Sequence, residues 1–116
     1  MGKEDCVFCQ IIDKKMKTEM IFEDEDIVAF HDINPQAPSH ILIVPKKHIS
    51  RVSELDDEDA PLLGKMIMLA KDIAKKNEFR ESGFRIAMND GKDRGQTIFH
   101  IHMHLLSGRR LMLPPG

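Results

Sequence analysis

Apolar residues recur at helical spacing in two stretches of the chain. The longer stretch runs from about Asp57 to Lys76, and every third or fourth position on one stripe is apolar: Leu62, Met66, Leu69 and Ile73. Acidic residues at its start and Lys75 and Lys76 at its end suit the helix dipole, so we expect one long helix here. The shorter stretch, from Cys6 to Lys14, predicts a short amphipathic helix near the N-terminus.

Shorter apolar runs, rich in branched and aromatic residues, predict strands elsewhere in the chain. We expect these strands at 19–22, 27–31, 40–44, 84–88 and 97–106. The connections between them are polar, with an acidic turn at 23–26 and an Asn-Asp-Gly turn at 89–91. This order, a short helix, strands, a long helix and strands, predicts one α+β domain over residues 1–116, built on an antiparallel sheet.

The last predicted strand carries three histidines at alternate positions. Side chains alternate between the faces of a strand, so His100, His102 and His104 are expected to share one face, while the residues between them enter the core. A hydrophobic core disfavours three adjacent polar rings. Two chemistries use such a row, metal binding and the transfer of a phosphoryl or nucleotidyl group to a neutral imidazole. A chance histidine-rich surface strand is the remaining alternative.

The residues that lead into this strand favour phosphoryl chemistry. They offer amides, a hydroxyl and backbone N–H groups that glycine leaves accessible: Asn89, Gly91, Gly95, Gln96 and Thr97. Such donors stabilise phosphate oxygens. A neutral imidazole, with an ordinary pKa of about 6.5, is already nucleophilic near neutral pH. An amine leaving group must be protonated, so we also expect an acid close to the nucleophile.

Cys6 and Cys9 form a Cys-x-x-Cys pair at the start of the chain. The pair alone is a weak signal, because a thioredoxin-type pair would follow a strand and precede a helix, whereas this pair opens the chain. A closed structural zinc site needs four ligands, so histidines distant in the sequence would have to complete it. The alternative is two free thiols that pack as small apolar side chains.

Composition excludes several classes of partner. The 116 residues include 17 basic and 19 acidic ones, and a formal net charge of -2 argues against nucleic acid or an anionic membrane as a partner. Six Phe, no Trp and no Tyr leave little surface for base stacking. No apolar run approaches the ~20 residues that span a bilayer. Without a secretory pattern at the start, we expect a cytoplasmic protein with reduced cysteines.

Together these motifs resemble the histidine triad (HIT) family, and specifically its Hint branch of histidine triad nucleotide-binding proteins. The family motif, three histidines that alternate with apolar residues and end in two more apolar residues, matches residues 100–106. The similarity covers nearly the whole chain, through the segments 29–38, 43–49, 89–91, 95–97 and the Pro-Pro-Gly end at 114–116.

This resemblance implies a fold and an activity. The fold is a five-stranded antiparallel sheet with one short N-terminal and one long central helix, and Hint members form homodimers that join two sheets. The reaction is the hydrolysis of purine nucleoside phosphoramidates, derivatives of AMP or GMP such as adenosine 5′-phosphoramidate and AMP-lysine. It passes through a covalent nucleotidyl-histidine intermediate and requires no metal.

The resemblance also implies roles for individual residues. His102 matches the nucleophile, His104 a histidine that contacts the phosphate, and His40 a supporting histidine that orients the nucleophile. With Thr97, these three make the implied catalytic set. Asp32 and Ile33 match the positions that hold ribose and base. The implied contacts on the phosphate side are Asn89, Gly95, Gln96 and Thr97, together with His102 and His104.

Family members with an N-terminal cysteine pair bind zinc through it, and their ligands match Cys6, Cys9, His48 and His100. The resemblance therefore implies a structural zinc ion. Thr97 departs from many Hint proteins, which carry serine there, and its methyl group would narrow the leaving-group side. Leu113 stands where several relatives have tryptophan. The alternatives are a dinucleoside polyphosphate hydrolase of the Fhit type, a nucleotide-binding scaffold with incidental catalysis, and a zinc-stabilised interaction module.

Overall fold

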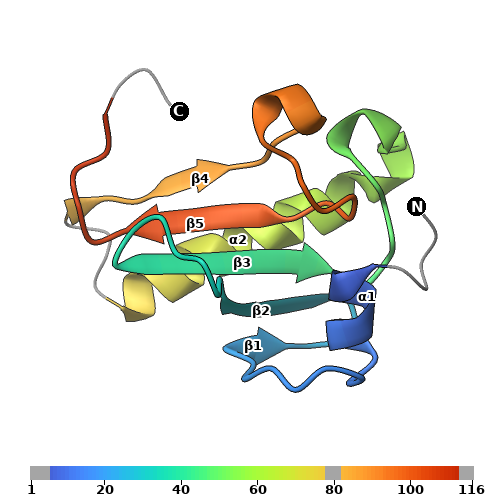
Figure 1. The fold of residues 1–116 in the computed structure, drawn as a ribbon, viewed down its shortest axis with the longest axis horizontal. Helices are drawn as coiled ribbons and strands as arrows, with labels where there is room; N and C mark the ends of the chain where they lie inside the picture. The colour runs from blue at the N-terminus through green and yellow to red at the C-terminus, as the bar shows by residue number, and fades with distance from the viewer. Residues whose placement is uncertain (1–5, 78–81, 113–116) are drawn as a thin grey trace.

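The computed structural model describes residues 6–77 and 82–112. Its centre is an antiparallel sheet of five strands in the spatial order β1-β2-β3-β5-β4 (Figure 1). The strands are β1 (Phe22–Glu23), β2 (Ile27–His31), β3 (Ser39–Pro45), β4 (Arg85–Ala87) and β5 (Met103–Ser107). The helices α1 (Val7–Ile12) and α2 (Ala60–Lys76) complete the α+β fold that the sequence predicts.

The two helices cover opposite faces of the sheet. α2 lies across one face (Figure 1), where Met66, Leu69 and Ile73 pack against alternate residues of β2, β3 and β5. α1 packs on the other face, over the remaining residues of β2 and β3. Because both faces are covered, β2 and β3 are buried almost throughout, which explains their nearly continuous apolar sequences.

The predicted long helix is confirmed, with a different first turn. Residues Asp57–Asp59 form a 3-10 turn, η3, in which the backbone N–H of Asp56 donates to the Asp59 carboxylate at 3.0 Å. The α-helix then begins at Ala60, with Pro61 in its first turn, where the missing amide hydrogen is not needed. No helix among the described residues is both long and apolar enough to cross a membrane.

The structure corrects two predicted strands and adds two short helical turns. β1 covers Phe22–Glu23 rather than 19–22, and the last strand begins at Met103 rather than at residue 97. Its pairing with β3 stops at the pair Ile43–Met103, because β3 then runs on to Pro45, which has no amide hydrogen to donate. Neither η2 (Val52–Glu54) nor η4 (Lys92–Arg94) was expected.

Candidate active site and candidate metal centre

The three histidines keep the predicted alternation, although only His104 lies in β5. The apolar residues between and after them are fully buried: Ile101, Met103 and Leu105. His100 and His102 face the opposite side, where Phe8 of α1 meets both rings, with centroid separations of 6.0 and 5.0 Å. The ring of His102 in turn contacts the ring of His104, with 5.0 Å between their centroids. The histidine row therefore runs along the α1 side of the sheet.

A backbone carbonyl determines the tautomer of His102. Its Nδ1 lies 2.8 Å from the carbonyl oxygen of His100, and because a carbonyl only accepts, Nδ1 carries the proton. The lone pair therefore resides on Nε2. Burial lowers the pKa of His102, so the ring is neutral near pH 7. A neutral, oriented imidazole with a free Nε2 lone pair is the form required of a nucleophile.

A second backbone group determines the tautomers of His40 and His104. The amide N–H of Gln36 donates to Nδ1 of His40 at 3.0 Å, so the proton of His40 is on Nε2. That Nε2–H donates to Nδ1 of His104 at 2.8 Å, and Asp32 lies 3.4 Å from the same nitrogen. His104 must then carry its own proton on Nε2, which makes this nitrogen a hydrogen-bond donor.

The pKa values of this pair are lowered by its surroundings. Burial lowers the pKa of His40, and the Asp32 carboxylate partly opposes that effect. Burial, followed by the neighbouring His102 and His40, lowers the pKa of His104 to about 4. Asp32, His40 and His104 lie close enough to hold a metal ion. We assign this trio instead to a hydrogen-bonded chain, because a proton lies between the two imidazoles.

A cleft of about 560 Å³ opens beside His102 and His104. Thr97, Asp32 and Ile33 line it, and the side chain of Ile33 is fully exposed. Its apolar wall includes Phe8, Phe30, Leu42 and Ile98. A cleft that combines an apolar wall with many polar side chains suits a flat heterocycle attached to a polar tail. We call it the nucleoside cleft below.

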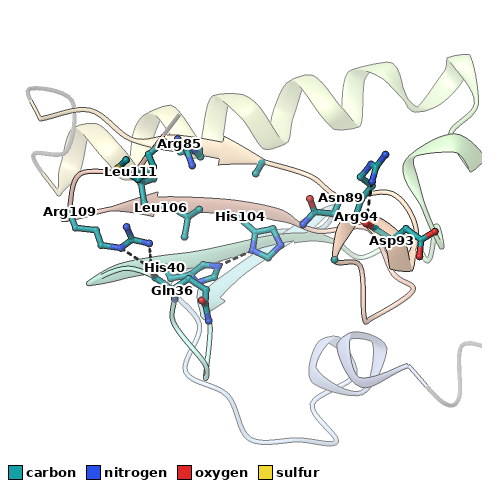
Figure 2. Close-up of a pocket in the computed structure, with 13 residues that line it drawn as sticks. Gln36, His40, Arg85, Asn89, Asp93, Arg94, His104, Leu106, Arg109 and Leu111 are labelled. Atoms are coloured by element: carbon teal, nitrogen blue, oxygen red, sulfur yellow. Dashed lines mark hydrogen bonds between the residues drawn. The ribbon is translucent and has the colours of Figure 1, made fainter. Parts of the chain in front are cut away.

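A second cleft, of about 750 Å³, is lined by His40 and His104 but not by His102 (Figure 2). The two clefts share the residues Gln36, His40, Gly95 and His104. Asn89 lines only the second cleft, which also carries three arginines, Arg85, Arg94 and Arg109. Gly95 has a φ of +92°, a backbone conformation that glycine adopts without strain and other residues rarely adopt.

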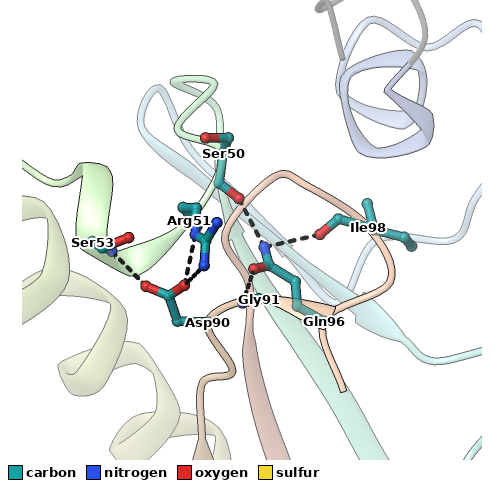
Figure 3. Close-up of polar contacts among 7 residues, drawn as sticks. All are labelled: Ser50, Arg51, Ser53, Asp90, Gly91, Gln96 and Ile98. Atoms are coloured by element: carbon teal, nitrogen blue, oxygen red, sulfur yellow. Dashed lines mark hydrogen bonds and ion pairs between the residues drawn. The ribbon is translucent and has the colours of Figure 1, made fainter. Parts of the chain in front are cut away.

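Gln96 holds in place the loop that leads from β4 toward the histidine row (Figure 3). The side chain is buried, and its amide nitrogen donates to the carbonyl oxygens of Ser50 and Ile98 at 2.7 and 3.1 Å. Its amide oxygen accepts the N–H of Gly91 at 2.8 Å. Gln96 lines neither cleft, so the structure separates it from the other residues predicted to contact the phosphate.

Two residues near the histidines had no predicted role. Gln36 acts through its backbone N–H, which no side-chain pattern reveals. Phe8 lies on α1 and reaches His102 only because α1 folds over β2 and β3. The helical spacing of apolar residues from Cys6 to Lys14 predicted the helix that carries Phe8, and only the tertiary structure shows which rings Phe8 contacts.

The structure brings Cys6, Cys9, His48 and His100 together from three distant segments, and their ligand atoms all lie within 4.8 Å of one another. Nδ1 of His100 is 3.3 Å from the sulfur of Cys6 and 3.5 Å from that of Cys9. Nδ1 of His48 is 3.3 Å from the Cys9 sulfur and 3.2 Å from Nδ1 of His100. Tetrahedral zinc with ordinary bond lengths requires about 3.5 Å between sulfur and nitrogen and about 3.3 Å between nitrogens.

The hydrogen bonding around His100 also fits a metal ligand. Its Nε2–H donates to the carbonyl oxygen of Pro45 at 2.7 Å, which leaves the Nδ1 lone pair directed at the cysteine sulfurs. Metal-bound histidines ordinarily donate their other N–H to a carbonyl or carboxylate in this way. Two thiols and two imidazoles, three of them buried, form a donor set that zinc prefers.

An α+β fold, with a row of hydrogen-bonded histidines on one face of its antiparallel sheet, defines the class of this protein. Comparison with known proteins gives the family, since the HIT domain matches residues 13–111. An uncharacterized HIT-like protein from Synechocystis is 41% identical over 113 residues, which cover 97% of this chain and 98% of that protein. The chain belongs to the histidine triad family.

Solved structures agree with this assignment. A HIT family hydrolase from Legionella pneumophila has 43% sequence identity and a TM-score of 0.94, over 97% of this chain and 100% of that one. A Zn-bound histidine triad family protein from Mycobacterium smegmatis has 32% identity and a TM-score of 0.81, over 99% and 85% of the two chains. Leu113 and the Pro-Pro-Gly end lie outside the described residues.

Proposed function

We propose that this protein hydrolyses purine nucleoside phosphoramidates, with His102 as the nucleophile. The observation that carries the proposal is the set of tautomers in the histidine row. Carbonyl and amide groups of the backbone leave an Nε2 lone pair on His102 and an Nε2–H on His104, side by side at the end of one cleft. One nitrogen can attack phosphorus while the other donates to a phosphate oxygen.

In the first step, the Nε2 lone pair of His102 forms a bond to the α-phosphorus, and the P–N bond of the substrate breaks. The electron pair of that bond goes to the departing amine nitrogen, which takes up one proton from water in the open cleft. We assign the exposed hydroxyl of Thr97 to relay this proton. The carbonyl oxygen of His100 stabilises the positive charge that develops on the imidazole, through the Nδ1–H bond.

In the second step, water attacks the α-phosphorus of the adduct. The bond between phosphorus and Nε2 breaks, its electron pair returns to His102, and the attacking water releases one proton. One proton is taken up and one is released, so the phosphoramidate and water give a nucleoside monophosphate and an amine. His104 donates its Nε2–H to a phosphate oxygen in both steps, and this bond strengthens as negative charge builds up.

The substrate contacts follow from the position of the reacting phosphate between the clefts. The base and ribose occupy the nucleoside cleft, next to Ile33 and Asp32. Asn89 and Gly95 reach the phosphate from the opposite wall. Gln96 contributes by holding the loop that presents Gly95 and Thr97, and not by direct contact with the substrate.

We assign the cluster of Cys6, Cys9, His48 and His100 to a structural zinc ion. The interatomic distances, the donor set and the resemblance to a Zn-bound relative support this assignment. A closed site with four protein ligands stabilises the fold and leaves no open position for chemistry. Metal analysis of the purified protein should find one zinc per chain, and a C6S/C9S double variant should lose it.

A homodimer through the β4 edge belongs to the same proposal. β4 is the last strand of the sheet, and its Ile86 pairs with Leu105, so its side chain lies on the α2 face. Ile86 is 36% exposed, and further large apolar side chains are exposed on and near α2 and β4: Ile67, Met68 and Phe84. An unpaired strand edge beside exposed apolar residues suits association with a second copy.

Substitution of the nucleophile tests the proposed activity. A His102→Ala variant should lose more than about a thousandfold in kcat on adenosine 5′-phosphoramidate, because the covalent route is lost. It should still be stabilised by AMP in a thermal melt, since the nucleoside cleft persists. Hydrolysis at the wild-type rate would contradict the role of His102. A wild-type protein that is not stabilised by either AMP or GMP would contradict a nucleotide function altogether.

A further inference from the structure

The cleft opposite the nucleoside cleft is basic. Its three arginines come from β4, from η4 and from the end of β5, and Asp93 is the one carboxylate that lines it. Figure 2 shows His40 and His104 near the middle of this cleft, with Arg109 toward one end and Arg94 toward the other. The nucleoside cleft carries no arginine. The two sides of the histidine row therefore differ in charge.

No carboxylate neutralises these arginines within residues 6–77 and 82–112. Each guanidinium donates instead to a backbone carbonyl oxygen: Arg85 to Met112, Arg94 to Asp93 and Arg109 to Gln36. Several other cations of the protein form ion pairs with carboxylates, as in Lys47–Asp59 at 2.6 Å and Arg51–Asp90 at 2.5 Å. A carbonyl accepts a hydrogen bond but leaves the positive charge in place, so the cleft attracts anions.

The geometry of displacement at phosphorus directs the leaving group into this cleft. This step rests on the function proposed above. The attacking nitrogen and the leaving group lie on opposite sides of phosphorus in an in-line displacement. His102 lines the nucleoside cleft and not the second one, whereas His104 and Gly95 line both. A phosphate held at that shared wall and attacked by His102 sends its leaving group past His104, toward the arginines.

We propose that the second cleft is a leaving-group subsite that selects amines carrying an anionic group, a carboxylate or a phosphate. Arg85 and Arg94 are the specificity-determining residues, because they line this cleft and, unlike Arg109, donate no hydrogen bond to the segment that orients His40. Arg109 also anchors the loop at Gln36, through two hydrogen bonds of 3.0 and 2.8 Å, so its substitution would disturb His40 as well. An amine that carries a second, positively charged group, such as 1,3-diaminopropane, is the disfavoured leaving group.

The test compares four adenosine 5′-phosphoramidates that differ only in the amine. The amines are propylamine, 3-aminopropanoate, phosphoethanolamine and 1,3-diaminopropane, which are neutral, carboxylate-bearing, phosphate-bearing and cationic. For the wild-type protein we expect kcat/KM to be about tenfold higher with either anionic amine than with the cationic one, and to be intermediate with propylamine. Preference for one anion over the other identifies which of them the subsite recognises.

The four amines also differ in intrinsic reactivity. This difference cancels when the ratio of kcat/KM for two amines in a variant is compared with the same ratio in the wild type. R85Q and R94Q should each lower the ratio of anionic to cationic kcat/KM by about threefold, as expected for partly exposed charges. K75Q removes one positive charge from the exposed end of α2 and should leave the ratio unchanged. Added salt should reduce the wild-type ratio and have less effect on R94Q.

The outcomes separate this proposal from the one on which it rests. Equal kcat/KM for all four amines, or a ratio that R85Q and R94Q do not change, would overturn the subsite while leaving the hydrolase proposal intact. An effect of K75Q equal to that of R94Q would also overturn it, since the preference would then follow net charge. No hydrolysis of any of the four compounds would overturn the proposed function itself.

Discussion

At the scale of single residues, the backbone controls the chemistry of the histidine row. His102 donates its Nδ1–H to a carbonyl, and His40 accepts an amide N–H, so each ring has one tautomer. The ring of His104 is oriented indirectly, by the hydrogen bond that it accepts from His40. The alternation of His and apolar residues predicted which rings are near each other. It could not predict the tautomers, because the groups that determine them are main-chain atoms of residues 36 and 100.

The lowered pKa values of His40 and His104 predict how activity depends on pH. Both rings are neutral over the neutral range, and protonation of His104 would require a pH near its pKa of about 4. We therefore expect kcat/KM to stay level as pH falls from 8 to 6.5 and to decline only below the ordinary histidine value of about 6.5. A profile of kcat/KM against pH, with controls for the effect of each buffer on the rate, measures this. An acid limb centred above pH 6.5 would contradict it.

The same shifts predict the direction of the pH dependence of stability. His104 has a lower pKa in the folded protein than in the unfolded chain, so the unfolded chain binds more protons between about pH 6.5 and 4. The free energy of unfolding should therefore fall as pH falls through this window, and His40 should add to the effect. Urea melts at several pH values should show the loss, and H104Q should reduce it.

Gln96 provides a prediction at the same scale. Gln96→Ala leaves partly buried backbone groups of Ser50, Ile98 and Gly91 without this partner, and each unpaired group costs about 1–3 kcal/mol unless water reaches it. We expect a loss of about 2–4 kcal/mol in the free energy of unfolding and a lower kcat, because the loop presents Gly95 and Thr97. Chemical denaturation measures the first effect. Wild-type stability with reduced nucleotide affinity would instead indicate direct contact with the ligand.

At the scale of the elements, apolar periodicity located α2, β2 and β3 well, because each buries a long apolar face. The apolar pattern gave a wrong strand boundary where the local sequence does not determine which segment a strand pairs with. The residues before Met103 look like a strand, but Pro45 opposite them has no amide hydrogen to donate, and Ile101 donates instead to the carbonyl of Ile49 at 2.7 Å. The four cysteine and histidine ligands come from three segments, and only the family resemblance connected them before the structure did.

Phe8 on α1 lies between the cysteine–histidine cluster and the proposed nucleophile, His102. It lies between Cys6 and Cys9 in the sequence and packs edge-on against both His100 and His102. Phe8→Leu keeps most of the apolar volume and loses these ring contacts, at a cost of about 1 kcal/mol in stability. We expect a lower rate of covalent adduct formation with full zinc content, measured by rapid quench and metal analysis. An unchanged rate would show that the ring only fills space.

At the scale of the whole molecule, the two proposed sites lie at different places along one face of the sheet. The cysteine–histidine cluster lies beyond the end of β3, and the histidine row continues from it to the two clefts. The outer edge at β4 stays available for a second copy of the chain. Position along this face thus separates His100, which we propose as a zinc ligand, from His102 and His104, which we propose for catalysis.

The proposed homodimer gives a prediction at this scale. Wild-type protein should sediment at twice the 13.3 kDa of one chain, and Ile86→Lys should shift it toward the monomer, because the charge would be buried at the interface. Ile21→Lys is the matched control, since Ile21 has a similar exposure of 37% but lies at the opposite edge of the sheet, next to β1. A monomeric wild-type protein, or dissociation by both substitutions, would exclude the β4 interface.

The central claim is that His102 attacks the α-phosphorus through its Nε2. Acid-quench mass spectrometry of the wild-type protein, mixed for milliseconds with an AMP-lysine phosphoramidate, tests it most directly. We predict an adduct heavier by one adenylyl group, mapped by peptide fragmentation to His102 and absent from His102→Ala. Turnover without any adduct, or an adduct mapped to His104 or another residue, would contradict the account.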